Sequence, residues 1–131
     1  MQKTLLIIKP DAVERKLIGH ILSRLEQAKF NILEMKMLHL SPERARRFYA
    51  VHQGKLFLDS LVEYMSSGPV VAILLQKSNA VADLRILVGA TDPAKAAVGT
   101  IRQEIGLDVQ QNSVHASDSL ETATGEISFF F

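Results

Sequence analysis

Apolar residues recur along the chain in two periods, and the shorter period marks strands. Residues 5–8 and 70–75 form unbroken apolar runs, a pattern typical of central strands buried on both faces. Residues 33–37 alternate between apolar and polar side chains, which predicts a half-buried strand. These three segments should belong to one sheet.

The longer period marks helices between these strands. Apolar residues at helical spacing predict helices over 17–28, 58–65 and 81–88. A further helix should begin after Ser41, because serine is a good N-cap and Pro42 suits the first helical position. The alternation of strands and helices fits a parallel α/β sheet and a ferredoxin-like βαββαβ sheet equally well.

The pattern stops after Gly89 and returns only near the C-terminus. The segment between carries glycines and no sustained period, and a connection of this length in a compact domain is usually functional. A last strand is predicted over 113–117, with Ser113 and His115 on its polar face. Three phenylalanines at 129–131 are too apolar to remain in water and should pack on the domain or on a neighbouring subunit.

Composition indicates one domain of moderate size. The chain has 131 residues, 47% apolar and 22% charged, which fits a single domain over 1–131. The absence of cysteine excludes disulfides and thiolate metal sites and agrees with a reducing compartment. A net charge of +1 indicates neither nucleic acid nor membrane as a partner. Lys9-Pro10-Asp11 interrupts the first apolar run before it could act as a signal sequence, so we expect a cytoplasmic protein.

One histidine stands in polar company that suits chemistry. Asn112 and Ser117 flank His115, and a neutral imidazole is a competent nucleophile because its unperturbed pKa is about 6.5. A structural histidine fits the same residues. His20 and His39 lack such neighbours and are interpreted as surface or core histidines.

Cations near the irregular segment suggest a site for an anion. Arg85 lies at the edge of a helical stripe, Arg102 and Thr91 lie in the glycine-containing loop, and Lys9 is expected at the exposed end of a buried strand. Arginine suits phosphate because its planar fork bonds two oxygens at once. The chain contains no glycine-rich loop of the P-loop or protein-kinase type. A phosphotransferase built on it therefore needs its own nucleophile.

Five ordered segments closely resemble nucleoside diphosphate kinases, and the resemblance covers nearly the whole chain. They are TLLIIKPDAV at 4–13, SGPVV at 67–71, GATDP at 89–93, GTIR at 99–102 and NSVHASDS at 112–119. The last segment, Asn-x-x-His-x-Ser-Asp-Ser, is highly specific.

The resemblance implies a fold, an activity and partners. The implied fold is an α+β, ferredoxin-like βαββαβ sandwich with an antiparallel four-stranded sheet and extra helices. The implied reaction transfers the γ-phosphate of a nucleoside triphosphate, mainly ATP, to a nucleoside diphosphate through a phosphohistidine. Mg²⁺ is expected as a cofactor carried by the nucleotide's phosphates rather than by protein ligands. The chain is expected to form a homo-oligomer, tetramer or hexamer, and to require neither membrane nor nucleic acid.

Specific residues match the family's catalytic positions. His115 matches the nucleophile, Glu126 the carboxylate that orients the imidazole, and Ser117 a hydroxyl bonded to it. Tyr49 matches a residue beside the histidine, and Lys9 a contact to phosphates and sugar. The other positions matched to nucleotide contacts are His52, Phe57, Arg85, Thr91, Arg102, Val109 and Asn112. Among these, Phe57 and Val109 are expected on either side of the base.

The chain departs from the family pattern at two places. Members usually read Lys/Arg-Pro-Phe-Phe around the stacking ring, whereas residues 55–58 read Lys-Leu-Phe-Leu. Many members have proline before Gly-Thr-Ile-Arg and Gly-Asp-Phe after it, whereas this chain has Val98 and Gln-Glu-Ile at 103–105. The first departure bears on nucleotide affinity and the second on subunit assembly.

Two other classes of function are alternatives for this sequence. A ferredoxin-like sheet can bind single-stranded RNA, but it then carries aromatic residues on its central strands, where this chain has Leu, Ile, Val and Met. A non-catalytic relative is the second alternative. It is disfavoured because every matched catalytic position is occupied.

Overall fold

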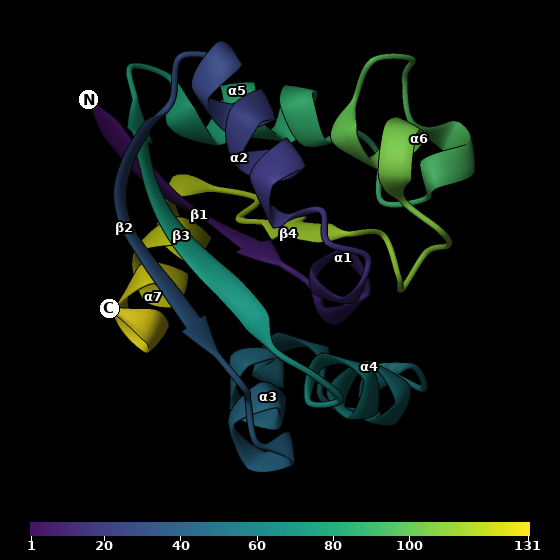
Figure 1. The fold of residues 1–131 in the computed structure, drawn as a ribbon. Helices are drawn as coiled ribbons and strands as arrows, with labels where there is room; N and C mark the ends of the chain where they lie inside the picture. Colours follow the sequence, from purple (N-terminus) through teal and green to yellow (C-terminus); the bar gives the residue numbers. More distant parts are fainter.

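The computed structural model describes residues 1–131 as a sheet flanked by helices (Figure 1). The strands are β1 (Gln2–Ile8), β2 (Asn31–Leu38), β3 (Val70–Lys77) and β4 (Val114–Ala116). The helices are α1 (Pro10–Glu14), α2 (Ile18–Gln27), α3 (Pro42–Phe48), α4 (Leu58–Met65), α5 (Ala80–Val88), α6 (Ile101–Ile105) and α7 (Leu120–Phe130), with short 3₁₀ turns at Ala50–His52 and Pro93–Lys95. None of the helices is both long enough and apolar enough to span a membrane.

The sheet decides between the two topologies that the sequence pattern allowed. Its strand order is β2-β3-β1-β4, and every neighbouring pair is antiparallel. The predicted ferredoxin-like α+β fold is therefore confirmed and a parallel sheet is excluded. The two unbroken apolar runs form the central strands β1 and β3, as predicted.

Each face of the sheet has its own core, because successive side chains of a strand point to opposite faces. Leu6 and Ile8 pack with α2 and α5, whereas Leu5 and Ile7 pack with α3, α4 and α7 (Figure 1). Burying each such side chain contributes roughly 1.5–3 kcal/mol. Phe130 is buried in the second core, so the prediction that the C-terminal phenylalanines pack on the domain holds for this residue.

Three helices escaped the sequence analysis. α1 and α6 have five residues each, too few to display a period. α6 begins at Thr100, whose hydroxyl accepts a bond from Gln103 N, and α7 begins at a capping box between Ser119 and Thr122. Arg102 therefore lies in a helix and not, as expected, in an irregular loop.

β2 was predicted to be half-buried, and in this chain that prediction is wrong. Leu33, Met35 and Met37 are 42%, 52% and 59% exposed. Met35 and Met37 pair with β3 residues on the face covered by α2 and α5, but β2 is the edge strand, so they have a neighbouring strand on one side only. The apolar side chains of Leu33, Met35 and Met37 therefore stay largely exposed in the single chain.

The last strand is shorter than the predicted 113–117, because Ser113 is not extended. Its φ of +76° lies in the left-handed region, and Val114 N–H donates to the Asn112 carbonyl across it at 3.0 Å. This tight turn separates Ser113 from the face that carries His115, contrary to the predicted alternation.

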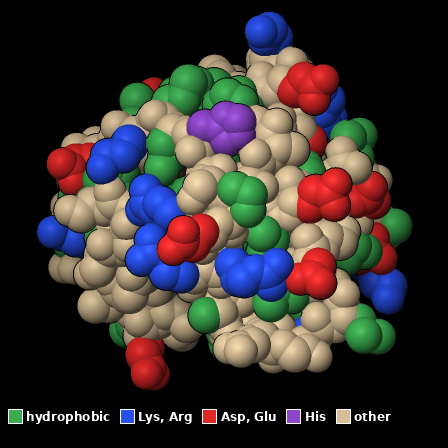
Figure 2. All heavy atoms as spheres, turned by 90° about the horizontal axis from the view of Figure 1, so that it is seen from below, with side chains coloured by type: hydrophobic (Ala, Val, Ile, Leu, Met, Phe, Trp, Pro, Cys, Tyr) green, Lys and Arg blue, Asp and Glu red, His purple; other side chains and the backbone are tan.

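Viewed from the side of α3 and α4, the surface carries charges of both signs without one dominant patch (Figure 2).

Candidate active site

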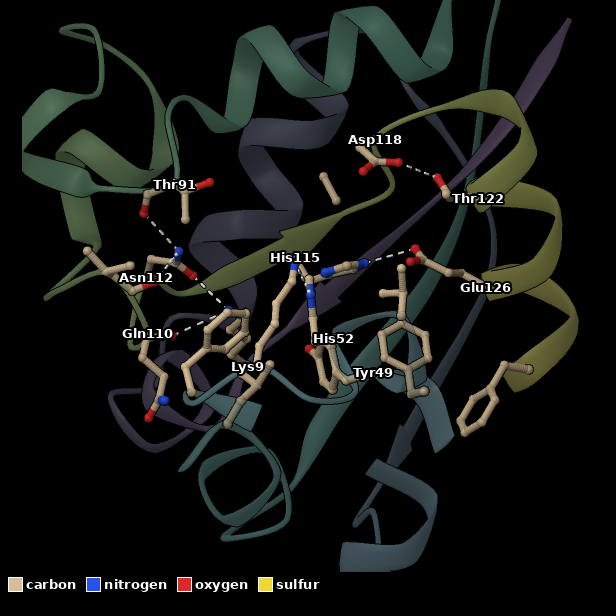
Figure 3. A pocket seen from close by; sticks show the side chains of 18 of the residues that line it. Lys9, Tyr49, His52, Thr91, Gln110, Asn112, His115, Asp118, Thr122 and Glu126 are labelled. Carbon is tan, nitrogen blue, oxygen red and sulfur yellow. Dashed lines mark hydrogen bonds and ion pairs between the residues drawn. The ribbon is translucent and has the colours of Figure 1, made fainter. Parts of the chain in front are cut away.

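A pocket of about 950 Å³ gathers almost all of the residues singled out in the sequence. Its lining includes Lys9, Tyr49, His52, Phe57, Arg85, Thr91, Arg102, Val109, Asn112, His115 and Glu126. The exception is Ser117, which is fully buried and reaches the site through Glu126. The side chains come from β4, α5, α6 and α7, from the junction of β1 and α1, from the segment between α3 and α4, and from the loops before and after α6 (Figure 3).

His115, on β4, is oriented by a carboxylate from helix α7. Its Nε2 lies 2.8 Å from Glu126 Oε1 on α7, and Ser117 Oγ donates to the same oxygen at 2.6 Å (Figure 3). Burial alone would raise the pKa of Glu126, but the bond and charge of His115, together with Ser117, hold that pKa below its ordinary value. Because an ionised carboxylate only accepts bonds, Nε2 carries the proton and Nδ1 keeps a free lone pair.

Aromatic rings fix the imidazole from the side. Phe48 and Tyr49 lie edge-on to His115, with centroids 5.4 and 6.2 Å away. The Tyr49 hydroxyl is buried without a hydrogen-bond partner, and burial raises its pKa, so it stays neutral. Phe48 is a site residue that the sequence analysis missed, although it lies in the helix predicted after Ser41.

Lys9 is buried rather than solvated, contrary to its expected place at an exposed strand end. Its side chain is 6% exposed, and Nζ donates to Asn112 Oδ1 at 2.9 Å and to the Gln110 carbonyl at 3.3 Å (Figure 3). Asn112 Nδ2 in turn donates to the Thr91 and Val109 carbonyls, both at 2.9 Å. Burial, followed by the nearby charge of Arg102, lowers the pKa of Lys9 from 10.5 to about 8.

Two arginines differ in how they reach the pocket. Arg102 is 5% exposed and donates to the Gly89 and Val114 carbonyls at 3.0 and 2.8 Å, while its buried Nε has no partner. Burial and the charge of Arg85 lower the pKa of Arg102 to about 10, which still leaves it charged at neutral pH. Arg85 is exposed and makes one long bond, 3.4 Å, to the Ala116 carbonyl.

The other end of the pocket is apolar and open. Phe57 and Val109 line it with 46% and 57% of their surface exposed. The His52 ring stands edge-on to Phe57 at 5.0 Å. Burial and the charge of Lys55 lower the pKa of His52, so its ring is neutral near pH 7. This end offers flat and apolar surface, and the His115 end offers charge.

Comparisons with known proteins agree with this geometry. The family model described as "Nucleoside diphosphate kinase" matches residues 2–131.

The chain belongs to the nucleoside diphosphate kinase family.

Curated members of the family match over nearly all of their length. The nucleoside diphosphate kinases of Pasteurella multocida (strain Pm70) and Histophilus somni (strain 2336) are each 56% identical to the chain over 131 residues, which cover 94% and 93% of those proteins. The Aquifex aeolicus nucleoside diphosphate kinase superposes with a TM-score of 0.96 at 45% identity, over 99% of this chain and 94% of that one. The halophilic nucleoside diphosphate kinase from Halobacterium salinarum, solved in complex with CDP, superposes with a TM-score of 0.96 at 39% identity. The match covers 99% of this chain and 87% of that one.

The departures from the nucleoside diphosphate kinase pattern have separate structural consequences. Leu56 is fully exposed, whereas Leu58 is buried in the core between α3, α4 and α7. Gln103 Oε1 accepts a bond from Gly99 N at 3.3 Å, and Glu104 lies 3.2 Å from Arg24 of α2. The altered residues after Arg102 therefore fasten the short helix that carries it.

Proposed function

We propose that this chain, as one domain over 1–131, transfers the γ-phosphate of a nucleoside triphosphate, mainly ATP, to a nucleoside diphosphate. The observation that carries the proposal is the bond between His115 Nε2 and Glu126, which leaves Nδ1 free in a pocket lined by cations. The residues matched to catalytic roles are His115, Glu126, Ser117, Lys9 and Tyr49, and those matched to nucleotide contacts are Lys9, His52, Phe57, Arg85, Thr91, Arg102, Val109 and Asn112.

The first half-reaction phosphorylates the protein. His115 Nδ1 attacks the γ-phosphorus, a nitrogen–phosphorus bond forms, and the bond to the bridging oxygen breaks. That oxygen leaves with the electron pair as part of the nucleoside diphosphate. Glu126 stabilises the positive charge that develops on the imidazole, as carboxylates do for other catalytic histidines. Lys9, Arg85 and Arg102 stabilise the charge on the phosphate oxygens.

The second half-reaction is the first in reverse, with a different diphosphate. Donor and acceptor occupy the same pocket in turn, because the phosphate waits on His115 between them. Mixing the purified protein with ATP and CDP should therefore yield CTP and ADP. A folded protein that produces no CTP would contradict the proposed function and favour a non-catalytic role.

We further propose Mg²⁺ as the cofactor, held by the nucleotide rather than by the protein. The pocket lining offers Lys9, Arg85 and Arg102 to phosphate oxygens, and its carboxylates are Asp118 and Glu126. This donor set fits an ion that arrives on phosphate oxygens. When bound, the ion supplies positive charge that neutralises those oxygens.

The proposed site should discriminate weakly among bases. Phe57 and Val109 offer stacking and apolar contact, which every base accepts through its π-face. Phe57→Ala should raise the KM for nucleotides about fivefold or more, since stacking contributes about 1–3 kcal/mol per base, and should lower kcat less. Steady-state kinetics with purine and pyrimidine diphosphates measure both effects. Leu56→Ala is the matched control, because Leu56 is exposed beside Phe57 and does not line the pocket. A strong preference for one base contradicts the proposal.

Nucleotide affinity should fall as the pH rises above about 8. The pKa of Lys9 in the free protein is about 8, and an anionic phosphate binds the protonated ammonium better than the neutral amine. The affinity for nucleotide should be constant below this pH. Above it, the affinity should fall by up to about tenfold per pH unit, until the pH reaches the pKa of Lys9 in the nucleotide complex. Calorimetric titration with ADP measures it. Lys9→Arg keeps its charge and should remove the fall between about pH 8 and 9; an equal fall in both proteins assigns it to another group.

We also propose a homo-oligomer and a cytoplasmic location. The exposed Leu33, Met35 and Met37 of β2 support the first, because an apolar, unpaired strand edge is suited to pairing with a second copy. The absence of cysteine supports the second.

Charge on this strand edge should disrupt the assembly. Met35→Glu should shift the protein towards a 14.5 kDa monomer in analytical ultracentrifugation, because the second copy would bury the new carboxylate. Ile86→Glu, an equal change at an exposed residue of α5, should leave the oligomer intact. An oligomer unchanged by Met35→Glu would place the interface elsewhere.

A further inference from the structure

A cluster of polar side chains around the buried Asp11 lies next to the pocket without lining it. It consists of Asp11, Arg15, Tyr64 and Ser113, and we refer to it as the Asp11 cluster. The Asp11 carboxylate accepts bonds from Arg15 at 2.8 Å, from Ser113 Oγ at 3.2 Å and from the Tyr64 hydroxyl. Asp11 is 5% exposed and Ser113 is fully buried. A carboxylate so enclosed is costly unless its oxygens are bonded, and here they are.

Two members of the cluster are joined through the chain to nucleotide contacts. Asp11 is the second residue of α1, whose N-cap is Lys9. Ser113 directly follows Asn112, and the Ser113 carbonyl accepts a bond from Lys9 N at 2.9 Å. The cluster therefore anchors both backbone segments from which Lys9 and Asn112 reach each other (Figure 3).

The other contacts reach two more elements of the site. Tyr64 lies on α4, whose N-cap is Phe57. Arg15 and Ser113 Oγ both donate to the Ile105 carbonyl, at 2.7 and 3.1 Å, at the end of the helix that carries Arg102. The Asp11 cluster thus joins α1, α4, α6 and the segment that leads into β4.

Ser113 itself holds a backbone conformation that serine disfavours. Its φ of +76° persists only where the surroundings enforce it. The hydroxyl shares its single proton between Asp11 Oδ2 and the Ile105 carbonyl, at 3.2 and 3.1 Å, and its oxygen accepts a bond from Arg15 at 3.0 Å. These bonds enforce the turn that sets the direction of Asn112 on one side and of His115 on the other.

We propose that Asp11 and Ser113 are positioning residues for nucleotide binding, which fix Lys9 and Asn112 where phosphate and sugar are bound. The inference rests on the proposed function, because it assigns the cluster a task at that site. It predicts that loss of the Ser113 hydroxyl weakens nucleotide binding although the hydroxyl touches no nucleotide.

Two substitutions of Ser113 separate positioning from stability. Ser113→Ala removes the bonds of the hydroxyl and keeps the unfavourable backbone, and it should weaken ADP binding about tenfold in calorimetry, since small misplacements of binding groups are costly. Ser113→Gly also removes the bonds but relieves the backbone, so its melting temperature should exceed that of Ser113→Ala. Its ADP affinity should nevertheless stay as low. Leu25→Val, a core change on α2, is the control, and it should lower the melting temperature without changing ADP affinity.

The outcomes distinguish this inference from the proposed function. ADP affinity of Ser113→Ala within twofold of the wild type, or an affinity that recovers with stability in Ser113→Gly, overturns the positioning role. Failure of the wild type to convert CDP to CTP while it binds ADP overturns the proposed function alone. Failure of the wild type to bind ADP at all overturns both.

Discussion

His115→Ala should abolish phosphotransfer and covalent labelling together. Without the nucleophile no phosphohistidine forms, and we expect turnover to fall by more than roughly 10⁴-fold, as for other enzymes that lose a nucleophile. Wild-type protein incubated with γ-labelled ATP alone should release ADP stoichiometrically and retain the label. The label should be lost in acid and kept in base, because it is attached through nitrogen.

Three comparisons sharpen this experiment. His39→Ala should keep both activities, since the His39 ring bonds only the Ser66 carbonyl on the surface. Glu126→Gln should slow labelling without abolishing it, because the amide still orients the ring but no longer stabilises its charge. Double-reciprocal plots for the wild type should be parallel. An acid-labile label on His115→Ala, or transfer that needs both nucleotides bound at once, would contradict the assignment.

The central strands and the longer helices were predictable because their buried residues recur at regular spacing in the sequence. The apolar runs in β1 and β3 and the stripe of α2 appear in the sequence at their own periods. Whether neighbouring strands pair parallel or antiparallel was not predictable, because central strands are equally apolar in both kinds of sheet. The edge position of β2 was hidden too, because Met35 and Met37 follow the pattern of residues that face a core.

The site was predictable to different depths for different residues. His115, Asn112 and Ser117 lie close together in the sequence, so their proximity could be inferred directly. Glu126 gave no signal of its own and was identified through the family resemblance, because only the packing of α7 brings it to His115. The burial of Lys9 was missed, since it depends on a loop about a hundred residues away that folds over it.

Arg102 illustrates how a residue assigned to a loop can have two roles in the folded protein. In the sequence, Arg102 lies three residues after Gly99 in a segment without regular apolar spacing, which is typical of a charged residue in a solvated loop. In the structure its guanidinium bridges the end of α5, at Gly89, and the start of β4, at Val114. Gly89 has a φ of +89°, and a Cβ there would lie 2.5 Å from Thr100 Oγ1. The close approach of Gly89 to Thr100, the N-cap of the helix that carries Arg102, therefore depends on glycine.

Arg102→Ala should lower the rate of His115 phosphorylation by roughly 10²–10³, the usual loss when one preorganised stabiliser of transition-state charge is removed. The same change leaves two carbonyls without their donor, so unfolding should also become easier by about 1–3 kcal/mol. Single-turnover kinetics well below the melting temperature, with circular dichroism to confirm the fold, separate these effects. Arg85→Ala, which removes an exposed charge with one long bond, should cost less stability. A folded Arg102→Ala protein with a rate within a fewfold of the wild type would make Arg102 a structural bridge alone.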